Sequence, residues 1–227
     1  MWMLIVLFVA GLLAFLIYAS YSIRAGIYLK SFCRKKTSEK IVALTFDDGP
    51  DKVRTPEILK VLDEYNVKAC FFCIGKKIKG NETLLKDIMS RGHLVGNHSY
   101  THSALLPCYS LKALKKDYLT CQFALEQVTL QPVRLFRPPF GVTNPTVAKA
   151  VQTLGYTSIG WDVRSLDTCI ADKRRVMLRI KRRLKPGSVV LLHDRLPDCD
   201  VLLRLLLEYL KQENYRVVRI DRMLDKD

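Results

Sequence analysis

Two adjacent carboxylates, Asp47 and Asp48, follow six apolar or β-prone residues that begin at Ile41. An uninterrupted run of this length is typical of a strand buried on both faces of a parallel sheet. The carboxylates then stand at the carboxyl end of that strand, where barrel-type α/β folds place their chemistry. Neighbouring carboxylates repel each other and are costly to desolvate, so a fold usually retains them beside a metal ion. Taken alone, the pair also fits an ordinary Asp-Gly turn.

Two of the four histidines, His98 and His102, are four positions apart. On a helical turn that spacing puts the Cβ atoms roughly 5–6 Å from each other, so both imidazoles can reach one ion. Two imidazoles and one carboxylate make an open metal site that keeps a position for water and substrate. A lone His-x-x-x-His is weak evidence, but together with the carboxylate pair it predicts a divalent-metal site. His93 lacks such partners, and we interpret it as structural.

Strand-like and helix-like segments alternate from Ile41 to the C-terminus. This alternation predicts an α/β fold, a distorted and incomplete (β/α) barrel of about seven parallel strands, rather than an open doubly wound sheet. Strands are expected at 41–46, 69–74, 94–97, 134–136, 157–161, 188–192 and 215–220. Helices are expected at 55–65, 81–91, 110–128, 144–155 and 171–184, and from 198 or 200 to 214.

The bulk composition fits one α/β domain with a short appendage, because the chain has 227 residues and is 49% hydrophobic. A net charge of +15 implies affinity for an anionic partner such as a membrane surface or an acidic glycan. No segment matches a nucleic-acid-binding module, so nucleic acid is not an expected partner. Cys70 and Cys73 lie in an apolar run and are expected to be buried thiols, not a zinc clip or redox pair. The oligomeric state is left open.

The first 23 residues contain no charged side chain and are mostly Leu, Ile, Val, Ala and Phe. As a helix they would extend roughly 35 Å, which is enough to cross a bilayer core. No Lys or Arg precedes this long apolar run, so an uncleaved single-pass transmembrane anchor is favoured over a cleaved signal peptide. The expected organisation is an anchor at 1–23, a basic linker at 24–40 and a catalytic domain at 41–227.

Four motifs resemble signature motifs of the polysaccharide deacetylase family. They are TFDDGP at 45–50, NHSYTH at 97–102, RPPFG at 137–141 and LLHD at 191–194. This family, the nodulation-deacetylase type of carbohydrate esterase family 4, contains metal-dependent enzymes that remove acetyl groups from chitin, peptidoglycan, xylan and related glycans. The match covers the chain from about Ile41 to the C-terminus in the family's order. It implies a distorted (β/α) barrel, in agreement with the strand count.

The resemblance implies that Asp48, His98 and His102 bind one divalent metal ion. Zn²⁺ is the first choice, with Co²⁺, Ni²⁺, Mn²⁺ or Fe²⁺ as alternatives. Such a metal lowers the pKa of a bound water from 15.7 to about 7, which provides a nucleophile at neutral pH.

The resemblance also assigns the proton transfers. Asp47 would be the general base for the attacking water, and Arg137 would pair with Asp47 to hold it ionised and oriented. His193 would be the general acid for the leaving group, a role that suits an imidazole. Asp167 matches the carboxylate that orients this histidine.

Phe140, Trp161, Thr168 and Leu191 are the predicted substrate-binding residues. The Phe140 backbone N–H would help to stabilise the oxyanion, and Leu191 would line the pocket for the acyl methyl group. The remaining motif departs from the family pattern Asp-x-x-Asp-Trp, because Arg164 replaces its first Asp and Thr168 replaces its Trp. Phe140 also stands where many members have Tyr. These departures leave the chemistry intact and the substrate open.

The leading functional hypothesis is a membrane-anchored, metal-dependent hydrolase of acetyl groups on an N- or O-acetylated glycan, such as peptidoglycan or an N-acetylglucosamine polymer. An alternative enzyme is a deacylase or deformylase of a lipid-linked sugar at the membrane surface. A third possibility is an inactive glycan-binding module, which the presence of all the expected ligands and the base disfavours. The side of the membrane stays open. Basic residues after the span favour the cytoplasm, whereas the family's usual substrates lie outside.

Overall fold

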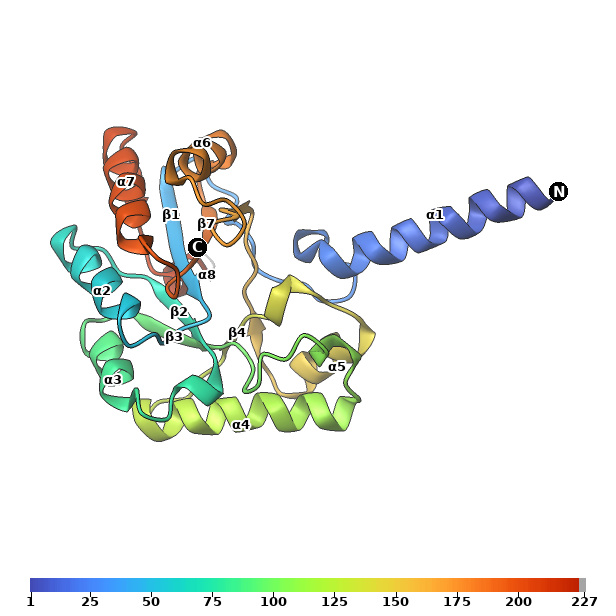
Figure 1. Cartoon of the computed structure of the whole chain (residues 1–227), viewed down its shortest axis with the longest axis horizontal. Coiled ribbons are helices and arrows are strands. Elements are labelled where there is room, and N and C mark those ends of the chain that lie inside the picture. Colours follow the sequence, from blue (N-terminus) through green and yellow to red (C-terminus); the bar gives the residue numbers. More distant parts are fainter. Residues whose placement is uncertain (225–227) are drawn as a thin grey trace.

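β1 (Ile41–Asp47), the strand in front of the two carboxylates, is central in the sheet of the computed structural model, which describes residues 1–224 (Figure 1). All of its residues are buried. It pairs in parallel with β7 (Ser188–His193) along one edge and with β2 (Cys70–Cys73) along the other. A strand covered on both faces and paired on both edges has no position for an exposed polar side chain, which explains its continuous apolar run.

The sheet order is β5-β4-β3-β2-β1-β7-β6, and all of these strands are parallel. The further strands are β3 (Leu94–Asn97), β4 (Leu135–Phe136), β5 (Thr157–Ser158) and β6 (Val163–Arg164). β5 and β6 are consecutive in the chain but lie at opposite ends of this order. Their short connection spans at most roughly 18 Å, so the two edges of the sheet must curl towards each other. The predicted α/β fold with a distorted, incomplete barrel of seven parallel strands is confirmed.

The strands differ from the prediction in three places. The strand expected at 157–161 ends at Ser158, because the next two carbonyls, of Ile159 and Gly160, accept hydrogen bonds from the Arg137 side chain. β6 was not predicted. The strand expected at 215–220 is reduced to β8 (Arg216–Val217), which pairs with the first two residues of β1, and α8 (Ile220–Leu224) follows it.

The predicted helices are present within about two residues of their expected bounds. They are α2 (Arg54–Glu64), α3 (Glu82–Ser90), α4 (Leu111–Thr129), α5 (Pro145–Thr153), α6 (Lys173–Arg183) and α7 (Cys199–Gln212). Local capping explains their starts: Ser110 and Asn144 accept hydrogen bonds from backbone N–H groups in the first turns of α4 and α5. Short 3₁₀ turns are η1 (Ile23–Ala25), η2 (Gly75–Lys77), η3 (Leu106–Cys108) and η4 (Pro139–Gly141).

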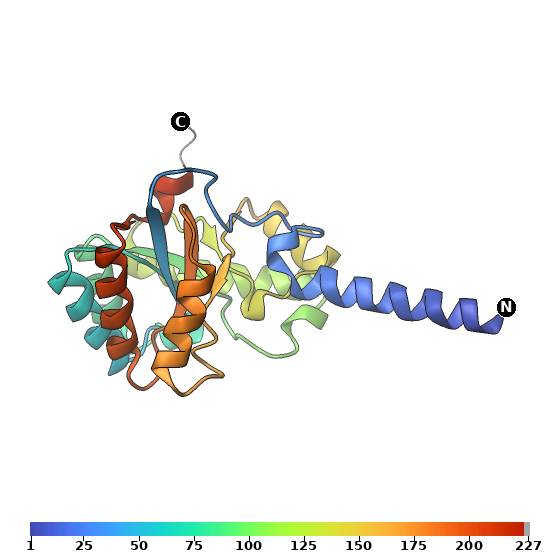
Figure 2. The same ribbon diagram turned by 90° about the horizontal axis from the view of Figure 1, so that it is seen from above.

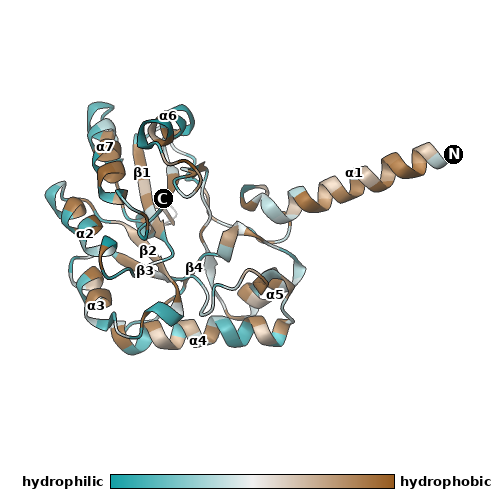
Figure 3. Ribbon diagram, viewed as in Figure 1, coloured by the Kyte–Doolittle hydropathy of each residue, from teal (hydrophilic) through white to brown (hydrophobic). Residues whose placement is uncertain are grey.

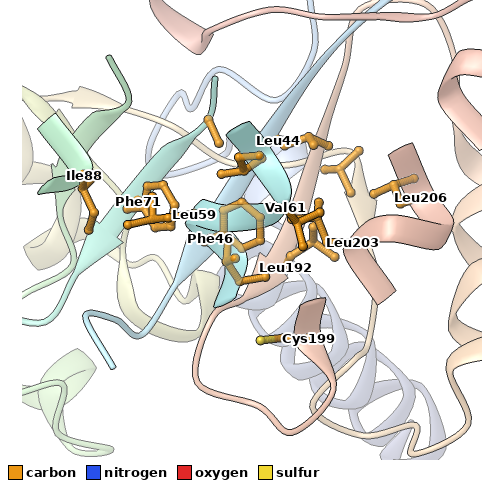
Figure 4. Packing of buried hydrophobic residues seen from close by; sticks show 14 of the residues in the cluster. Leu44, Phe46, Leu59, Val61, Phe71, Ile88, Leu192, Cys199, Leu203 and Leu206 are labelled. Atoms are coloured by element: carbon orange, nitrogen blue, oxygen red, sulfur yellow. The ribbon is translucent and has the colours of Figure 1, made fainter. Parts of the chain in front are cut away.

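The main hydrophobic core lies between the central strands and helices α2 and α7 (Figure 4). Phe46 of β1 stacks on Phe71 of β2 with ring centroids 5.0 Å apart. Leu192 of β7, Leu59 of α2 and Leu203 of α7 belong to the same cluster. Each such fully buried side chain contributes roughly 1.5–3 kcal/mol. The core therefore fixes the strands whose carboxyl ends carry the polar motifs.

α1 (Trp2–Tyr21) projects from the domain in both views (Figures 1 and 2) and is apolar over most of its length (Figure 3). Ala19 is its one buried residue. Within residues 1–224, α1 is the one helix that is long and apolar enough to cross a membrane, although a signal sequence passes the same test. The helix is confirmed, and its role as an anchor remains a prediction.

Residues 24–40, predicted as a basic linker, follow a packed path along the domain. Leu29 and Cys33 are buried. Phe32 forms a β-bridge with Ile159, just after β5, and Arg34 forms one with Ser188, at the start of β7. This segment therefore crosses from the edge strand β5 to β7, the neighbour of the other edge strand, β6.

Candidate active site

The predicted catalytic and metal-binding residues lie at the carboxyl ends of four parallel strands, on the same side of the domain. β1 ends at Asp47, β7 ends at His193, and β3 and β4 end directly before His98 and Arg137. Nine of the eleven predicted site residues line one pocket of about 150 Å³, namely Asp47, Asp48, His98, His102, Phe140, Trp161, Thr168, Leu191 and His193. The other two, Arg137 and Asp167, lie behind it and bond to Asp47 and His193. A wider hollow along α4 is lined by no carboxylate or imidazole, so the chemistry belongs to the smaller pocket.

Asp48, His98 and His102 offer three ligand atoms that all lie within 4.8 Å of one another. Nε2 of His98 and Nε2 of His102 lie 3.6 and 3.3 Å from Oδ1 of Asp48. Nδ1 of His98 lies 2.8 Å from the carbonyl oxygen of Arg137, to which it donates as the Nδ1–H tautomer. That bond leaves the Nε2 lone pair directed at the Asp48 carboxylate, which is how a metal-binding imidazole is oriented.

The ionisation of this group also fits a cation. Burial, assisted by His98, lowers the pKa of His102 to about 4, so this imidazole is neutral at physiological pH. Burial alone would raise the pKa of Asp48. The nearby charge of His98, a hydrogen bond from Arg195 and the nearby charge of His102 outweigh burial and lower that pKa to about 2. Neutral imidazole with an ionised carboxylate is a donor set that suits Zn²⁺ and similar divalent ions. The residues therefore fit a divalent metal.

The loop after β3 brings the two imidazoles together by an irregular path, not by the helical turn that their spacing predicted. Ser99 and His102 have left-handed backbones, with φ angles of 65° and 47°. The carboxylate of Asp117, on α4, accepts hydrogen bonds from two backbone N–H groups of this loop. Asp48 and Phe140 are also left-handed, with φ angles of 76° and 61°. Such strained residues gather at functional sites, where the surrounding structure must hold them.

Asp47 and Arg137 form a buried ion pair, with Nη1 of the arginine 2.7 Å from Oδ1 of the aspartate. Arg137 is fully buried, and it also donates to the carbonyl oxygens of Ile159 and Gly160. A guanidinium bonded on several sides is a rigid partner, so it fixes the orientation of the Asp47 carboxylate. The second carboxylate oxygen, Oδ2, lies 3.7 Å from Nε2 of His98 and thus faces the metal-ligand group.

His193 is held by Asp167 through two bonds. Nδ1 of His193 lies 2.7 Å from Oδ1 of Asp167, and the His193 backbone N–H donates to Oδ2. Ser165 donates its hydroxyl to the same carboxylate. Burial would lower the pKa of His193, but the hydrogen bond and charge of Asp167 outweigh it and raise that pKa. Asp167 therefore favours the protonated form of His193, with Nε2 left for the pocket.

The predicted substrate-binding residues form the walls of the pocket. Leu191 and Trp161 are buried, whereas Phe140 and Thr168 are exposed. Gly141 is needed beside Phe140, because a Cβ there would lie 2.4 Å from the Trp161 ring and because its φ angle is +69°. No described residue accepts a hydrogen bond from the Phe140 N–H, which leaves this donor available to a ligand.

Two arginines also line the pocket. Arg195, which was not predicted, donates through Nε to Oδ2 of Asp48 at 2.7 Å. Its one signal in the sequence is its place two residues after His193. Arg164, noted above only as a departure from the family motif, lies with its guanidinium carbon 6.0 Å from the Trp161 ring.

His93 and the cysteines lie outside the pocket. His93 is buried, accepts a hydrogen bond from the Ala69 N–H, and has a pKa lowered to about 4, chiefly by burial. Cys70 and Cys73 are fully buried, and burial raises the pKa of both thiols. All seven cysteines of the chain are free. The buried His93, Cys70 and Cys73 pack in the core and are structural in this fold.

Comparison with known proteins agrees with this site. The family model of polysaccharide deacetylase matches residues 34–159. A peptidoglycan-N-acetylglucosamine deacetylase of Bacillus cereus is 34% identical over 193 residues, which cover 82% of this chain and 89% of that protein. A chitooligosaccharide deacetylase of Sinorhizobium fredii is 33% identical over 175 residues, covering 77% and 81%.

Solved structures give the same result. The Bc1960 peptidoglycan N-acetylglucosamine deacetylase has a TM-score of 0.79 at 27% identity, covering 85% of this chain and 92% of that one. BA3943, a CE4 family pseudoenzyme from Bacillus anthracis, also has a TM-score of 0.79, at 30% identity, covering 85% and 68%. Motifs, fold and sequence similarity together show that this chain belongs to the polysaccharide deacetylase family.

Proposed function

We propose that this protein is a metal-dependent hydrolase that removes acetyl groups from an N-acetylated glycan. The observation that carries the proposal is that Asp47, His193 and the group Asp48, His98 and His102 all line one small pocket. A base, an acid and a cation site are the three parts that amide hydrolysis at neutral pH requires. The named relatives, which are deacetylases of peptidoglycan and chitooligosaccharides, support a glycan as the substrate.

Each residue has one task in the reaction. A divalent cation held by Asp48, His98 and His102 would supply Lewis acidity to the acetyl carbonyl. Asp47, oriented by Arg137, accepts a proton from the water that attacks the carbonyl carbon. The Phe140 N–H donates to the carbonyl oxygen as its negative charge grows. His193 then gives its Nε2 proton to the amide nitrogen while the C–N bond breaks, which releases acetate and the free amine.

The pocket walls leave room for only a short acyl group on the substrate. Leu191 is buried, and the pocket has a volume of about 150 Å³, so an acetyl or formyl group fits where a long acyl chain does not. Thr168, in place of a bulky indole, leaves the mouth open next to Arg164. These features favour a sugar whose neighbouring groups need room.

A glycan-binding module without activity is the competing function, because BA3943 is described as a CE4 family pseudoenzyme. The complete set of base, acid and ligands around one pocket favours an enzyme here. A pure binding role would not require the ion pair between Arg137 and Asp47 or the short bond between Asp167 and His193.

The test is acetate release by the full-length protein in detergent. Acetylated chitooligosaccharides, peptidoglycan fragments and xylan oligomers are supplied with Zn²⁺ or Co²⁺, and formylated sugars are included to test the alternative acyl group. Activity should disappear with a chelator and return with metal. Asp47→Asn should keep the metal and lose about 10²–10⁴-fold in turnover, because it removes only the base.

Asp63→Asn is the control, because Asp63 forms surface ion pairs with Arg91 and Lys68 on another part of the chain. Its turnover should equal that of the unmodified protein. If the metal-loaded protein released neither acetate nor formate from any of these glycans, the binding-module alternative would stand.

A further inference from the structure

The last turn of α1 is docked on the catalytic domain. Ala19 is fully buried, and the carbonyl oxygen of Ser20 accepts a hydrogen bond of 2.9 Å from the Thr143 N–H. Thr143 lies two residues after Gly141, on the loop that carries Phe140 at the pocket. The rest of α1 extends away from the domain (Figure 2). The helix is thus attached at one end, next to the candidate active site.

Ile23, two residues beyond α1, packs behind the pocket wall. It is 3% exposed and forms a small apolar cluster with Cys33, Trp161 and Leu191. Trp161 and Leu191 line the pocket on their other side. The packing is tight, because a Cβ on Gly160 would lie 2.5 Å from the Cys33 sulfur and 3.3 Å from Ile23. The residues that leave the helix therefore form the outer layer of the pocket wall.

The segment after Ile23 has no freedom to act as a tether. A flexible chain of that length would give an r.m.s. reach of roughly 20–25 Å. Here the Phe32 N–H donates to Ser158, the Gly160 N–H donates to Phe32, and the Lys35 N–H donates to Gly187. These bonds tie the segment to the end of β5 and to the start of β7. The distance between the end of α1 and the pocket is therefore fixed by packing.

α1 has the dimensions and the surface of a membrane span. Its 20 residues extend about 30 Å, the thickness of the hydrocarbon core. Its apolar side chains are exposed around the whole helix, and the first charged side chain of the chain is Arg24. A bilayer that covers these side chains ends at the last turn of α1. The turn that reaches the bilayer surface is the same turn that contacts Thr143, and Ile23 follows directly.

We propose that the docked end of α1 holds the pocket at the bilayer surface, and that the substrate is a glycan carried on a membrane lipid. This inference rests on the proposed deacetylase function. A pocket fixed at this height does not reach glycan far from the membrane, whereas a sugar on a lipid diffuses in the plane of the bilayer to the pocket. The pocket entrance suits that boundary, because Phe140 is exposed and apolar and the exposed Arg164 matches anionic head groups.

The substrate class is tested with the full-length protein in nanodiscs, whose two faces are both open to solvent. N-acetylchitotriose is supplied either free or coupled to dioleoyl-phosphatidylethanolamine in the same nanodiscs, at equal bulk concentration. Confinement in one membrane raises the effective concentration, so the lipid-carried sugar should be deacetylated at least about tenfold faster. The advantage should disappear when the glycolipid is in separate nanodiscs.

The outcomes separate the two proposals. Equal or faster hydrolysis of the free sugar would overturn the lipid-carried substrate and leave the deacetylase function intact. Hydrolysis of neither sugar, with acetate release from another glycan of the panel above, would also overturn the lipid-carried substrate alone. Absence of release from both sugars and from the whole panel would remove the deacetylase function, and this inference with it.

The docking is tested with Ile23→Ala, which removes the contact behind Trp161 and Leu191. Turnover should fall by about tenfold through misplacement of the wall, and the emission of Trp161 should shift, measured in a Trp2→Phe background. The conservative variant Ile23→Val should keep most of the original turnover and most of the original Trp161 emission. Ile27→Ala is the matched control, because Ile27 lies in the same segment but is exposed. If Ile23→Ala and Ile27→Ala gave the same turnover and emission with metal content and melting temperature unchanged, the wall contact would be irrelevant to the pocket.

Discussion

His102 and His193 line the same pocket, yet their surroundings shift their pKa values in opposite directions. Burial lowers the pKa of His102 to about 4, whereas Asp167 raises the pKa of His193 against the effect of burial. A neutral imidazole can bind a metal ion, and a protonated one can donate a proton. We call Asp48, His98 and His102 the metal side and His193 with Asp167 the acid side. One residue type serves both sides because burial and His98 dominate at His102, whereas the hydrogen bond and charge of Asp167 dominate at His193.

The two sides are also supported differently. The metal side depends on irregular backbone, with left-handed residues at Asp48, Ser99 and His102. The acid side depends less on irregular backbone, because His193 ends the strand β7, although Asp167 lies in a loop after β6 in which Leu166 is left-handed. We therefore expect variants of the metal side to lose the ion itself, and variants of the acid side to change the pH dependence while the ion remains.

The largest effect is expected on the metal side. His98→Ala should lose stoichiometric metal in elemental analysis, because two ligands hold a divalent ion poorly. Loss of the Lewis acid removes several kcal/mol of transition-state stabilisation, which is about 10³-fold or more in turnover. Circular dichroism should show a folded protein. Full metal retention by this variant would mean that His98 is not a ligand and that the metal side is wrongly composed.

A smaller, pH-dependent effect is expected on the acid side. Asp167→Asn removes the charge that raises the pKa of His193, so that pKa should fall. Amide hydrolysis requires the protonated form and is lost as the pH rises through this pKa. The alkaline limb of turnover should therefore move to lower pH, with metal content unchanged.

Activated esters provide the internal control for this variant, because their leaving groups need no proton. Their hydrolysis should change much less than that of amides. An alkaline limb at the same pH in both proteins would show that His193 does not limit the reaction as its acid.

The smallest effect is expected at the pocket entrance, which belongs neither to the metal side nor to the acid side. Arg164 is exposed, and such charges contribute roughly 0.2–1 kcal/mol, equivalent to at most about fivefold in KM. Arg164→Ala should raise KM for acidic glycans by that amount, leave turnover unchanged, and have less effect at high salt. Arg174→Ala, on the exposed surface of α6, is the matched control. An equal effect on neutral and acidic glycans would show that the Arg164 charge does not select the substrate.

Much of the candidate site was predictable from the sequence. The run before Asp47 identifies a buried strand, and the polar motifs follow directly after strands. Because parallel strands end at one edge of a sheet, local patterns suffice to bring Asp48, His98 and His193 together. The helix bounds were predictable for a similar reason, since caps such as Ser110 and Asn144 act within a few residues.

The tertiary structure alone decided the features that depend on contacts between distant residues. The Arg137 side chain ends β5 by donating hydrogen bonds to the carbonyl oxygens of Ile159 and Gly160, and no local sequence pattern predicts these bonds. Arg195 reaches Asp48 from another strand end, and Ile23 packs on Trp161 although the basic residues after it resemble a loose linker. Periodicity and capping describe neighbours within about one turn or one strand, whereas these contacts join segments far apart in the chain. Their positions therefore follow only from the pairing of distant strands and the curling of the sheet.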